Sequence, residues 1–266
     1  MQWKKFSYYA EHDKPYWIPL DLNLQMPKNS ILPIDQQHFL AFIPWEDKYF
    51  DLIPDDLKIF FEHIKDKLSV RTTDVHTAVC LGMIDQYLSK FPEANRQVVG
   101  LALILHDVGW SNLTEQEIAL SLGVSGLQLT NQAVAPKLKH AVLGQKISKE
   151  ILDTYKFNKP LNENEMQLIL QAIRYHDEPW EIKNEDNEIP IEVKLLVDLD
   201  HIWSFTYQNF WQDTARKGVE PEEYADNLEA DTDSYFISDF GKQKARELLK
   251  DRRDEINDLK EFIARN

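Results

Sequence analysis

Four histidines recur at similar intervals along apolar stretches of the chain. They are His76, His106, His140 and His176, and consecutive members lie 30 to 36 residues apart. An interval of that length holds one helix and one turn, so each of four helices is expected to deliver one imidazole to a common interior. Neutral imidazole is a frequent ligand of divalent metals. The spacing therefore predicts a metal centre inside a helical protein.

The strongest single element is the pair His106 and Asp107, which closes the most apolar stretch of the chain. Burying an unpaired carboxylate there is costly, and the C-terminal end of a helix disfavours negative charge. A divalent cation bound by both side chains would offset both penalties, and Gly109 would let the chain turn away from the site. The alternative is that Asp107 caps the following turn and that His106 only packs.

The order His, His-Asp, Asp on successive helices resembles the signature of the HD-domain superfamily. The matching residues are His76, His106, Asp107 and Asp200. The resemblance covers roughly residues 60–215 and implies that these four side chains bind one divalent ion, whose activated water attacks phosphorus. Asp198 lies about 200° from Asp200 around a helix. It is therefore expected to be an outer-shell or surface residue.

Some HD proteins carry two more histidines and bind a second metal, with the aspartate of the HD pair bridging the ions. His140 and His176 stand at the corresponding places, and the alternative is one metal with two pocket histidines. Mixed imidazole and carboxylate ligands predict one or two divalent ions without distinguishing Fe, Mn, Zn, Co, Ni and Mg. Trp110 departs from the pattern because many two-metal relatives have a catalytic lysine there. Asp177 departs too, since two-metal phosphodiesterases often have a second histidine there.

Metal-assisted hydrolysis of a phosphate ester suits this ligand set best. The expected substrate is a nucleotide or another small phosphorylated molecule. The predicted catalytic residues are Asp107, which would hold the attacking water, together with His106 and His140. A histidine would protonate the leaving group. Arg71 and Lys137 are the candidate phosphate contacts, and the alternative for each is an ordinary surface charge.

Three other functions compete with this interpretation. The same ligand set resembles that of mixed-valent di-iron HD oxygenases acting on a small polyol or phosphonate, although myo-inositol oxygenase has the lysine that Trp110 replaces. Residues 113–126 look like a helix-turn-helix, but residues 111–136 contain no Lys or Arg, so duplex nucleic acid is not an expected partner. A regulatory HD protein that binds a nucleotide without hydrolysing it is disfavoured by the intact ligand set.

Caps, prolines and helical periodicity indicate the elements that must position these residues. Helices are expected over 55–67, 72–90, 93–107, 136–155, 162–176, 190–210 and 238–264, with a short capped helix from Thr114. Residues 181–188 and 220–233 are acidic and are expected to form loops. Strand signals are almost absent, so the predicted fold class is an all-α, multi-helix HD-domain bundle.

Three parts are expected along the chain. Residues 1–55 hold six prolines and three tryptophans, which predicts an irregular but ordered arm packed on the main body. Residues 56–215 would form the HD domain. Residues 216–266 would form a C-terminal helical extension that ends in a long helix.

The composition restricts partners and compartment. The net charge of −15 leaves no basic face for nucleic acid, so a phosphorylated substrate needs a local cation such as a bound metal. No apolar run approaches the ~20 residues of a membrane span, and the N-terminus lacks the apolar region of a secretory signal. With the single Cys80, these features predict a cytoplasmic protein that binds no membrane. The oligomeric state stays open, a homodimer included.

Overall fold

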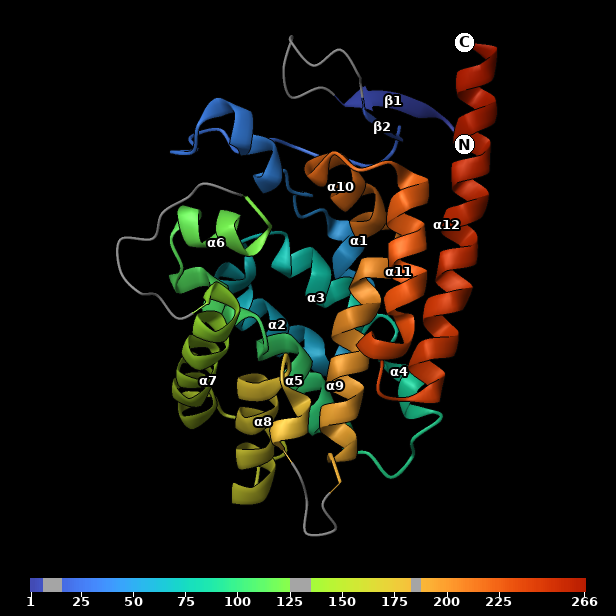
Figure 1. Ribbon diagram of the computed structural model, residues 1–266. Helices are drawn as coiled ribbons and strands as arrows, with labels where there is room; N and C mark the ends of the chain where they lie inside the picture. Colours follow the sequence, from blue (N-terminus) through green and yellow to red (C-terminus); the bar gives the residue numbers. More distant parts are fainter. Residues whose placement is uncertain (7–15, 125–134, 183–187) are drawn as a thin grey trace. The chain divides into compact units, whose positions relative to one another are not determined.

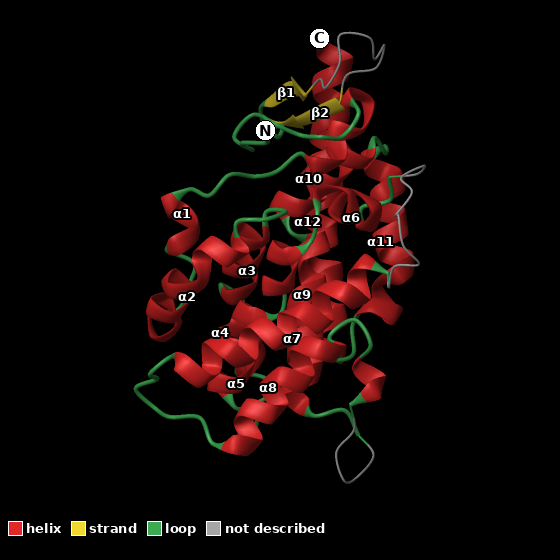
Figure 2. Ribbon diagram, turned by 90° about the vertical axis from the view of Figure 1, so that its left-hand side faces the viewer, coloured by secondary structure: helices red, strands yellow, loops and turns green. Residues whose placement is uncertain are grey.

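A computed structural model describes residues 1–6, 16–124, 135–182 and 188–266. In these ranges the regular structure is helical apart from one two-stranded sheet (Figure 2). The predicted all-α class is therefore confirmed. None of the described helices combines the length and the apolar character that a membrane crossing requires.

Contacts along the backbone divide the chain into two compact units. The discontinuous unit contains Met1–Pro44 and His201–Asn266, and the continuous unit is Trp45–Asp200. These limits differ from the expected boundaries near residues 55 and 215. The difference arises because the two ends of the chain fold together: the Trp3 ring meets Trp211 edge-on at 4.8 Å, and Trp3 Nε1 donates to Asp258 Oδ2 at 3.0 Å.

The discontinuous unit combines a small sheet with helices. Its elements are β1 (Trp3–Phe6), β2 (Tyr16–Pro19), η1 (Ile34–Leu40), η4 (Ile202–Phe205), α10 (Tyr207–Lys217), α11 (Pro221–Tyr235) and α12 (Asp239–Arg265). The strands are antiparallel, with Trp3 opposite Pro19. Helices α11 and α12 lie side by side (Figure 1), where Arg253 forms ion pairs with Asp226 and Glu229.

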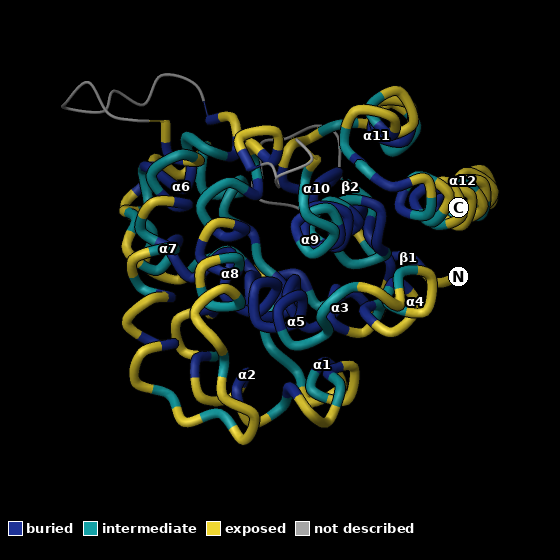
Figure 3. The backbone as a smooth tube through the Cα atoms, turned by 90° about the horizontal axis from the view of Figure 1, so that it is seen from below, coloured by how far each residue is buried: buried dark blue, intermediate teal, exposed yellow. Residues whose placement is uncertain are grey.

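The continuous unit is a helical bundle. Its elements are α1 (Asp47–Phe50), α2 (Asp55–Leu68), α3 (Thr73–Leu81), α4 (Ile84–Leu88), α5 (Arg96–Leu105), η2 (Val108–Asn112), α6 (Glu115–Ser121), α7 (Pro136–Thr154), α8 (Glu163–Tyr175), η3 (Pro179–Glu181) and α9 (Ile191–His201), whose last residue belongs to the other unit. Helix α5 lies at its centre, contacts α2, α3 and α8, and is buried along most of its length (Figure 3).

Local sequence signals explain where α5 begins and why it can lie so deep. The Asn95 side chain accepts hydrogen bonds from the backbone of Gln97 and Val98, which caps the helix two residues after its expected start. Gly100 allows a close approach to α2, because a Cβ at this position would lie 2.8 Å from Leu57 Cδ1. The result is an apolar rod whose last turn delivers His106 into the interior.

Several predicted helix boundaries are confirmed to within one or two residues. Helices α2, α7, α8 and α12 match the expected ranges, and Ser238 caps α12 through the backbone of Gly241. The capping box of Thr114 and Glu117 at the start of α6 is also present. Residues 125–134 and 183–187 lie outside the described residues. The second half of the helix-turn-helix resemblance and most of the loop expected at 181–188 therefore fall outside them too.

Two predicted helices are interrupted. The helix expected over 72–90 breaks between Leu81 and Ile84, where Gly82 packs so closely that an added Cβ would lie 3.3 Å from Leu52 Cβ. The helix expected over 190–210 ends at His201. The extended backbone of Thr206 and its hydroxyl, which accepts from Asn209 N, then begin a new helix.

Two further expectations were wrong. Residues 220–233 form most of helix α11 instead of an acidic loop, because Pro221 occupies the first helical position and Glu222 and Glu223 fall in the first turn, where negative charge is favourable. The strands β1 and β2 were not expected. Their pairing joins segments on either side of residues 7–15, so no short hairpin signal marks it in the sequence.

Candidate metal centre

All six predicted metal ligands belong to the continuous unit. His76 lies on α3, His140 on α7 and Asp200 on α9, while His106 and His176 cap the C-terminal ends of α5 and α8, and Asp107 precedes η2. The four histidines and Asp107 are buried, and the Asp200 side chain is 17% exposed. Five helices and one turn thus bring imidazoles and carboxylates together at the core of the bundle.

One half of the cluster gathers around Asp200. The Asp200 Oδ1 atom lies 3.2 Å from His76 Nε2 and 3.3 Å from His106 Nε2. Asp107 Oδ2 lies 3.4 Å from His76 Nδ1 and 3.5 Å from His106 Nε2. Metal–ligand bonds of about 2.1 Å imply ligand–ligand separations of roughly 3.0–3.4 Å at octahedral or tetrahedral angles. These separations are close to those of a coordination shell. The two His76 distances are to different ring nitrogens, of which one ion can bind only one.

The other half gathers around the second oxygen of Asp107. Asp107 Oδ1 lies 3.4 Å from His140 Nε2, which in turn lies 3.1 Å from His176 Nε2. Ligand atoms of His76, His106 and Asp107, and separately those of Asp107, His140 and His176, lie close enough to hold an ion. Asp107 belongs to both groups: its Oδ2 faces His76 and His106, and its Oδ1 faces His140.

Two of the histidines are oriented by carbonyl groups of their own helices. His106 Nδ1 lies 2.7 Å from Leu103 O, and His176 Nδ1 lies 2.7 Å from Ile173 O. A carbonyl can only accept, so Nδ1 carries a proton in both rings and Nε2 is the atom left for a ligand. His106 Nε2 is buried and makes no hydrogen bond within the described part of the chain. A bound cation would satisfy it.

The electrostatics of the cluster favour ionised carboxylates. Burial alone would raise the pKa of Asp107, yet His106, His140 and His76 hold that pKa well below its usual range. The pKa of Asp200 is also held well below its usual range, because His106 and His76 outweigh its burial. Burial, only partly opposed by Asp107, lowers the pKa of His140. Ionised carboxylates beside a neutral imidazole are the forms that bind a cation.

The pKa of His106 also reflects the negative charge of the cluster. Burial lowers its pKa, but the negative charges of Asp107 and Asp200 outweigh burial and raise it. A proton on Nε2 and a metal ion therefore compete for one position, and metal binding at His106 would release that proton.

Residues 73–202 match the family model described as the HD domain, and this range contains all six candidate ligands. The chain therefore contains an HD domain. No curated protein and no solved structure matches it. The HD domain is characteristic of metal-dependent hydrolases that bind divalent ions, and the histidine–aspartate groups found here fit such ions in donor type and spacing.

Within this HD domain, two glycines allow η2 to lie directly against α7. A Cβ on Gly109 would lie 1.9 Å from His140 O, and a Cβ on Gly144 would lie 3.2 Å from His106 O. Gly109 was expected to let the chain turn away, but its backbone does not have a positive φ. Its role is the close approach that puts Asp107 beside His140.

Trp110, which was noted in the sequence only as a departure from the family, contacts the centre of the HD site. Its Nε1 donates to Asp107 Oδ1 at 2.9 Å. Its ring stacks on His140, with the centroids 4.1 Å apart and the planes 11° apart. The Arg71 guanidinium lies 3.9 Å from the same ring centroid. The long-range contacts to Arg71 and His140 could not be read from the sequence.

The remaining candidates lie at different distances from the centre. Lys137 is 69% exposed, and its Nζ lies 3.7 Å from Asp177 Oδ1. Asp177 Oδ2 lies 3.8 Å from His176 Nε2, at the edge of the second ligand group. Asp198 is fully buried, so the surface alternative for it was wrong. Cys80 was missed as a neighbour of His76, although its position one helical turn later was a visible signal.

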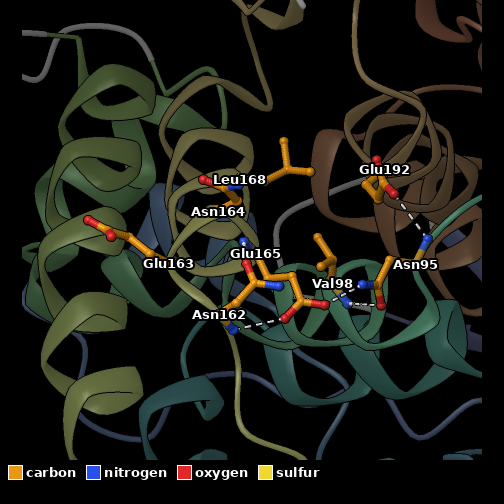
Figure 4. Close-up of a pocket in the computed structure, with 8 residues that line it drawn as sticks. All are labelled: Asn95, Val98, Asn162, Glu163, Asn164, Glu165, Leu168 and Glu192. Atoms are coloured by element: carbon orange, nitrogen blue, oxygen red, sulfur yellow. Dashed lines mark hydrogen bonds between the residues drawn. The ribbon is translucent and has the colours of Figure 1, made fainter.

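A separate pocket of about 610 Å³ lies at the opposite end of α5 from His106 (Figure 4). It forms where the first turns of α5, α8 and α9 meet. Its polar groups already hold one another: Asn95 N donates to Glu192 Oε1 at 3.0 Å, and Asn95 Nδ2 donates to Glu165 Oε1 at 2.7 Å. These contacts explain the pocket as a junction of helix caps.

Proposed function

We propose that this HD domain is a phosphohydrolase that cleaves a phosphate ester of a nucleotide or another small phosphorylated molecule. The observation that carries the proposal is the position of Asp107. One carboxylate oxygen faces His76 and His106, and the other faces His140, so the single side chain can serve two ions. A two-ion site with a shared carboxylate suits displacement at phosphorus.

The residues divide into two groups around this carboxylate. His76, His106, Asp107 and Asp200 would hold one ion, and Asp107, His140 and His176 would hold the other. When bound, the ions would lower the pKa of water toward ~7 and polarise a phosphoryl oxygen. Asp107 would orient the attacking water.

His140 has two alternative roles, which metal stoichiometry distinguishes. With two ions bound, His140 is a ligand. With one ion bound in the group around Asp200, Nε2 of His140 binds no metal. The lowered pKa of His140 then makes the ring a neutral imidazole that can accept and return a proton.

Arg71 is the better of the two candidate phosphate contacts. Its guanidinium rests on Trp110, and that indole touches both Asp107 and His140, so a permanent cation stands next to the ligand cluster. Guanidinium groups bind phosphate oxygens through paired hydrogen bonds. In a chain of net charge −15, such a local cation would offset long-range repulsion of an anionic substrate.

The burial of the cluster favours a small substrate. His106 is fully buried, and His140 and His176 are each 2% exposed. A phosphoryl group must therefore enter a narrow recess, which a terminal phosphate can do and the backbone of a duplex cannot. The acidic composition disfavours a duplex for an independent reason.

The test is a panel of nucleotides and phosphomonoesters assayed with Mn²⁺, Mg²⁺, Co²⁺ and Fe²⁺. The wild type is expected to release phosphate, Asp107→Asn to lose that activity together with its metal, and His63→Ala, at an exposed histidine, to keep both. Metal-loaded protein that releases no phosphate from any member would overturn the proposal. Dioxygen uptake that depends on bound iron would instead support a di-iron oxygenase, which the same ligand set suits.

A further inference from the structure

The indole of Trp110 lies between a fixed positive charge and the centre of the candidate site. One ring face meets His140 in a nearly parallel stack, and the Arg71 guanidinium lies 3.9 Å from the ring centroid. The indole N–H points at Asp107 Oδ1, the same oxygen that lies 3.4 Å from His140 Nε2. A single side chain therefore touches two of the three members of the second ligand group.

We propose that Trp110 is a positioning residue for the second metal: it fixes the Asp107 carboxylate and the His140 ring in the relative placement that this ion requires. The inference rests on the proposed two-ion function. Trp110 itself would not touch substrate or metal.

The histidines of the cluster show why this support is needed. His106 and His176 are each held by a hydrogen bond from Nδ1 to a carbonyl of their own helix. His140 Nδ1 is buried and has no hydrogen-bond partner among the described residues. The stack on Trp110, with planes 11° apart, takes the place of the missing anchor and sets the direction in which Nε2 points.

The hydrogen bond to Asp107 performs the matching task on the carboxylate. An indole N–H can only donate, so it occupies one lone pair of Oδ1 and prevents the carboxylate from rotating. The other lone pair of Oδ1 stays directed toward His140. The contacts of Trp110 are with Asp107 Oδ1, the His140 ring and Arg71, on the side of the second ligand group, so its removal should affect the second ion more than the first.

Trp110 stands where many two-metal HD proteins have a catalytic lysine, and this difference changes what the position can contribute to the reaction. A lysine carries a proton that it can give up, whereas an indole N–H does not titrate in the accessible pH range. The positive charge is supplied by Arg71 on the ring, and a guanidinium stays protonated. The two tasks of a lysine are therefore divided here: the Trp110 indole positions the ligands, and the Arg71 guanidinium supplies the positive charge.

The experiment compares metal binding by full-length wild type, Trp110→Phe and Trp110→Leu. Phenylalanine keeps an aromatic ring against His140 but removes the N–H, and leucine removes both. Apoprotein is titrated with Mn²⁺ by calorimetry, and thermal unfolding is followed in parallel. The second equivalent is expected to weaken by about 10- to 100-fold in Trp110→Phe and further in Trp110→Leu, as for other residues that orient metal ligands. The first equivalent is expected to change less than about threefold.

Trp45→Phe is the matched control, because Trp45 lies in the same unit and stacks on Phe61 with the centroids 5.4 Å apart. Its other ring contacts are with Tyr49 and Lys65, and none of these three residues is a candidate ligand. It should bind both equivalents like the wild type. Two tight equivalents in Trp110→Phe would overturn the positioning role and leave the proposed function standing. So would equal weakening of both equivalents together with a lower melting temperature, because this result indicates a purely structural role. A single equivalent in the wild type would overturn the second metal itself.

Discussion

Substituting Gly109 by alanine should separate the two helical segments that build the second half of the site. A Cβ at this position would lie 1.9 Å from His140 O and 2.6 Å from Gly144 N. Both atoms belong to the backbone of α7 and cannot rotate away. To reach an ordinary contact of 3.4 Å, η2 and α7 must separate by about 1.5 Å. That shift moves Asp107 away from His140.

Gly109→Ala should lower the free energy of unfolding and weaken the second metal ion, and each effect has its own expected magnitude. Overpacking a well-filled interior costs about 1–3 kcal/mol, and a clash with two backbone atoms belongs at the upper end, so we expect about 3 kcal/mol. A displacement of catalytic groups by 1 Å costs up to about 100-fold in rate. Misplaced ligands lower metal affinity by about 10- to 100-fold, and we expect the second ion to weaken by about 100-fold.

Urea unfolding and metal titration of three glycine variants measure these effects. Gly144→Ala should be milder, since its Cβ would lie 3.2 Å from His106 O, and Gly82→Ala milder still, at 3.3 Å from Leu52 Cβ and away from the ligands. If Gly109→Ala unfolds like the wild type and binds two ions, then η2 and α7 do not pack as described and the reasoning fails.

Three further predictions concern charge and helix ends. Arg71→Gln should lower kcat/KM by about 30-fold, equivalent to about 2 kcal/mol for a charged hydrogen bond, with metal content unchanged; the exposed Lys137→Gln is the control, and equal effects of the two would contradict the assignment of Arg71. Burial alone would raise the pKa of Asp213, but Arg216 and Lys217 lower it to about 2, so its contribution to stability is present above the unfolded value of 3.8 and is lost as the pH falls toward 2. Urea unfolding should therefore show wild type more stable than Asp213→Asn by roughly 2 kcal/mol at pH 5, and the difference should shrink at pH 2.5; a difference independent of pH would exclude this linkage. Asn162→Ala removes the cap on Glu165 N and should cost about 1 kcal/mol, seen as a melting temperature lower by a few degrees, and an unchanged melting temperature would mean that the cap contributes nothing.

The parts of the fold that the sequence predicted are those governed by local chemistry. Thr114 caps its helix through a side chain three residues from its target, so the signal and the structure occupy the same short segment. The His106–Asp107 pair was predicted for a similar reason, because a carboxylate at the end of an apolar helix demands a counter-charge wherever the helix lies.

The parts that the sequence did not predict depend on contacts between distant segments or on competing local preferences. Residues 220–233 were interpreted as a loop because of their charge, although Pro221 marked a helix start. Nine residues separate β1 from β2 along the sequence, so no short hairpin motif predicts their pairing. Gly109 was assigned to a turn from the sequence. Its actual role is the close approach to the backbone of α7, which only the three-dimensional structure shows.

Trp110 makes one local contact and one contact with a distant segment. Its hydrogen bond to Asp107 spans three residues and could have been inferred from the short turn, whereas its stack on His140 joins α7 to η2 and required the structure. In the sequence this position was noted only as a departure, because many two-metal relatives have a lysine there. The indole instead contacts the Asp107 carboxylate and the His140 imidazole at once, and the Arg71 guanidinium on its ring brings a permanent positive charge to the same position. A departure from a family motif is therefore best judged by the atoms that the new side chain touches.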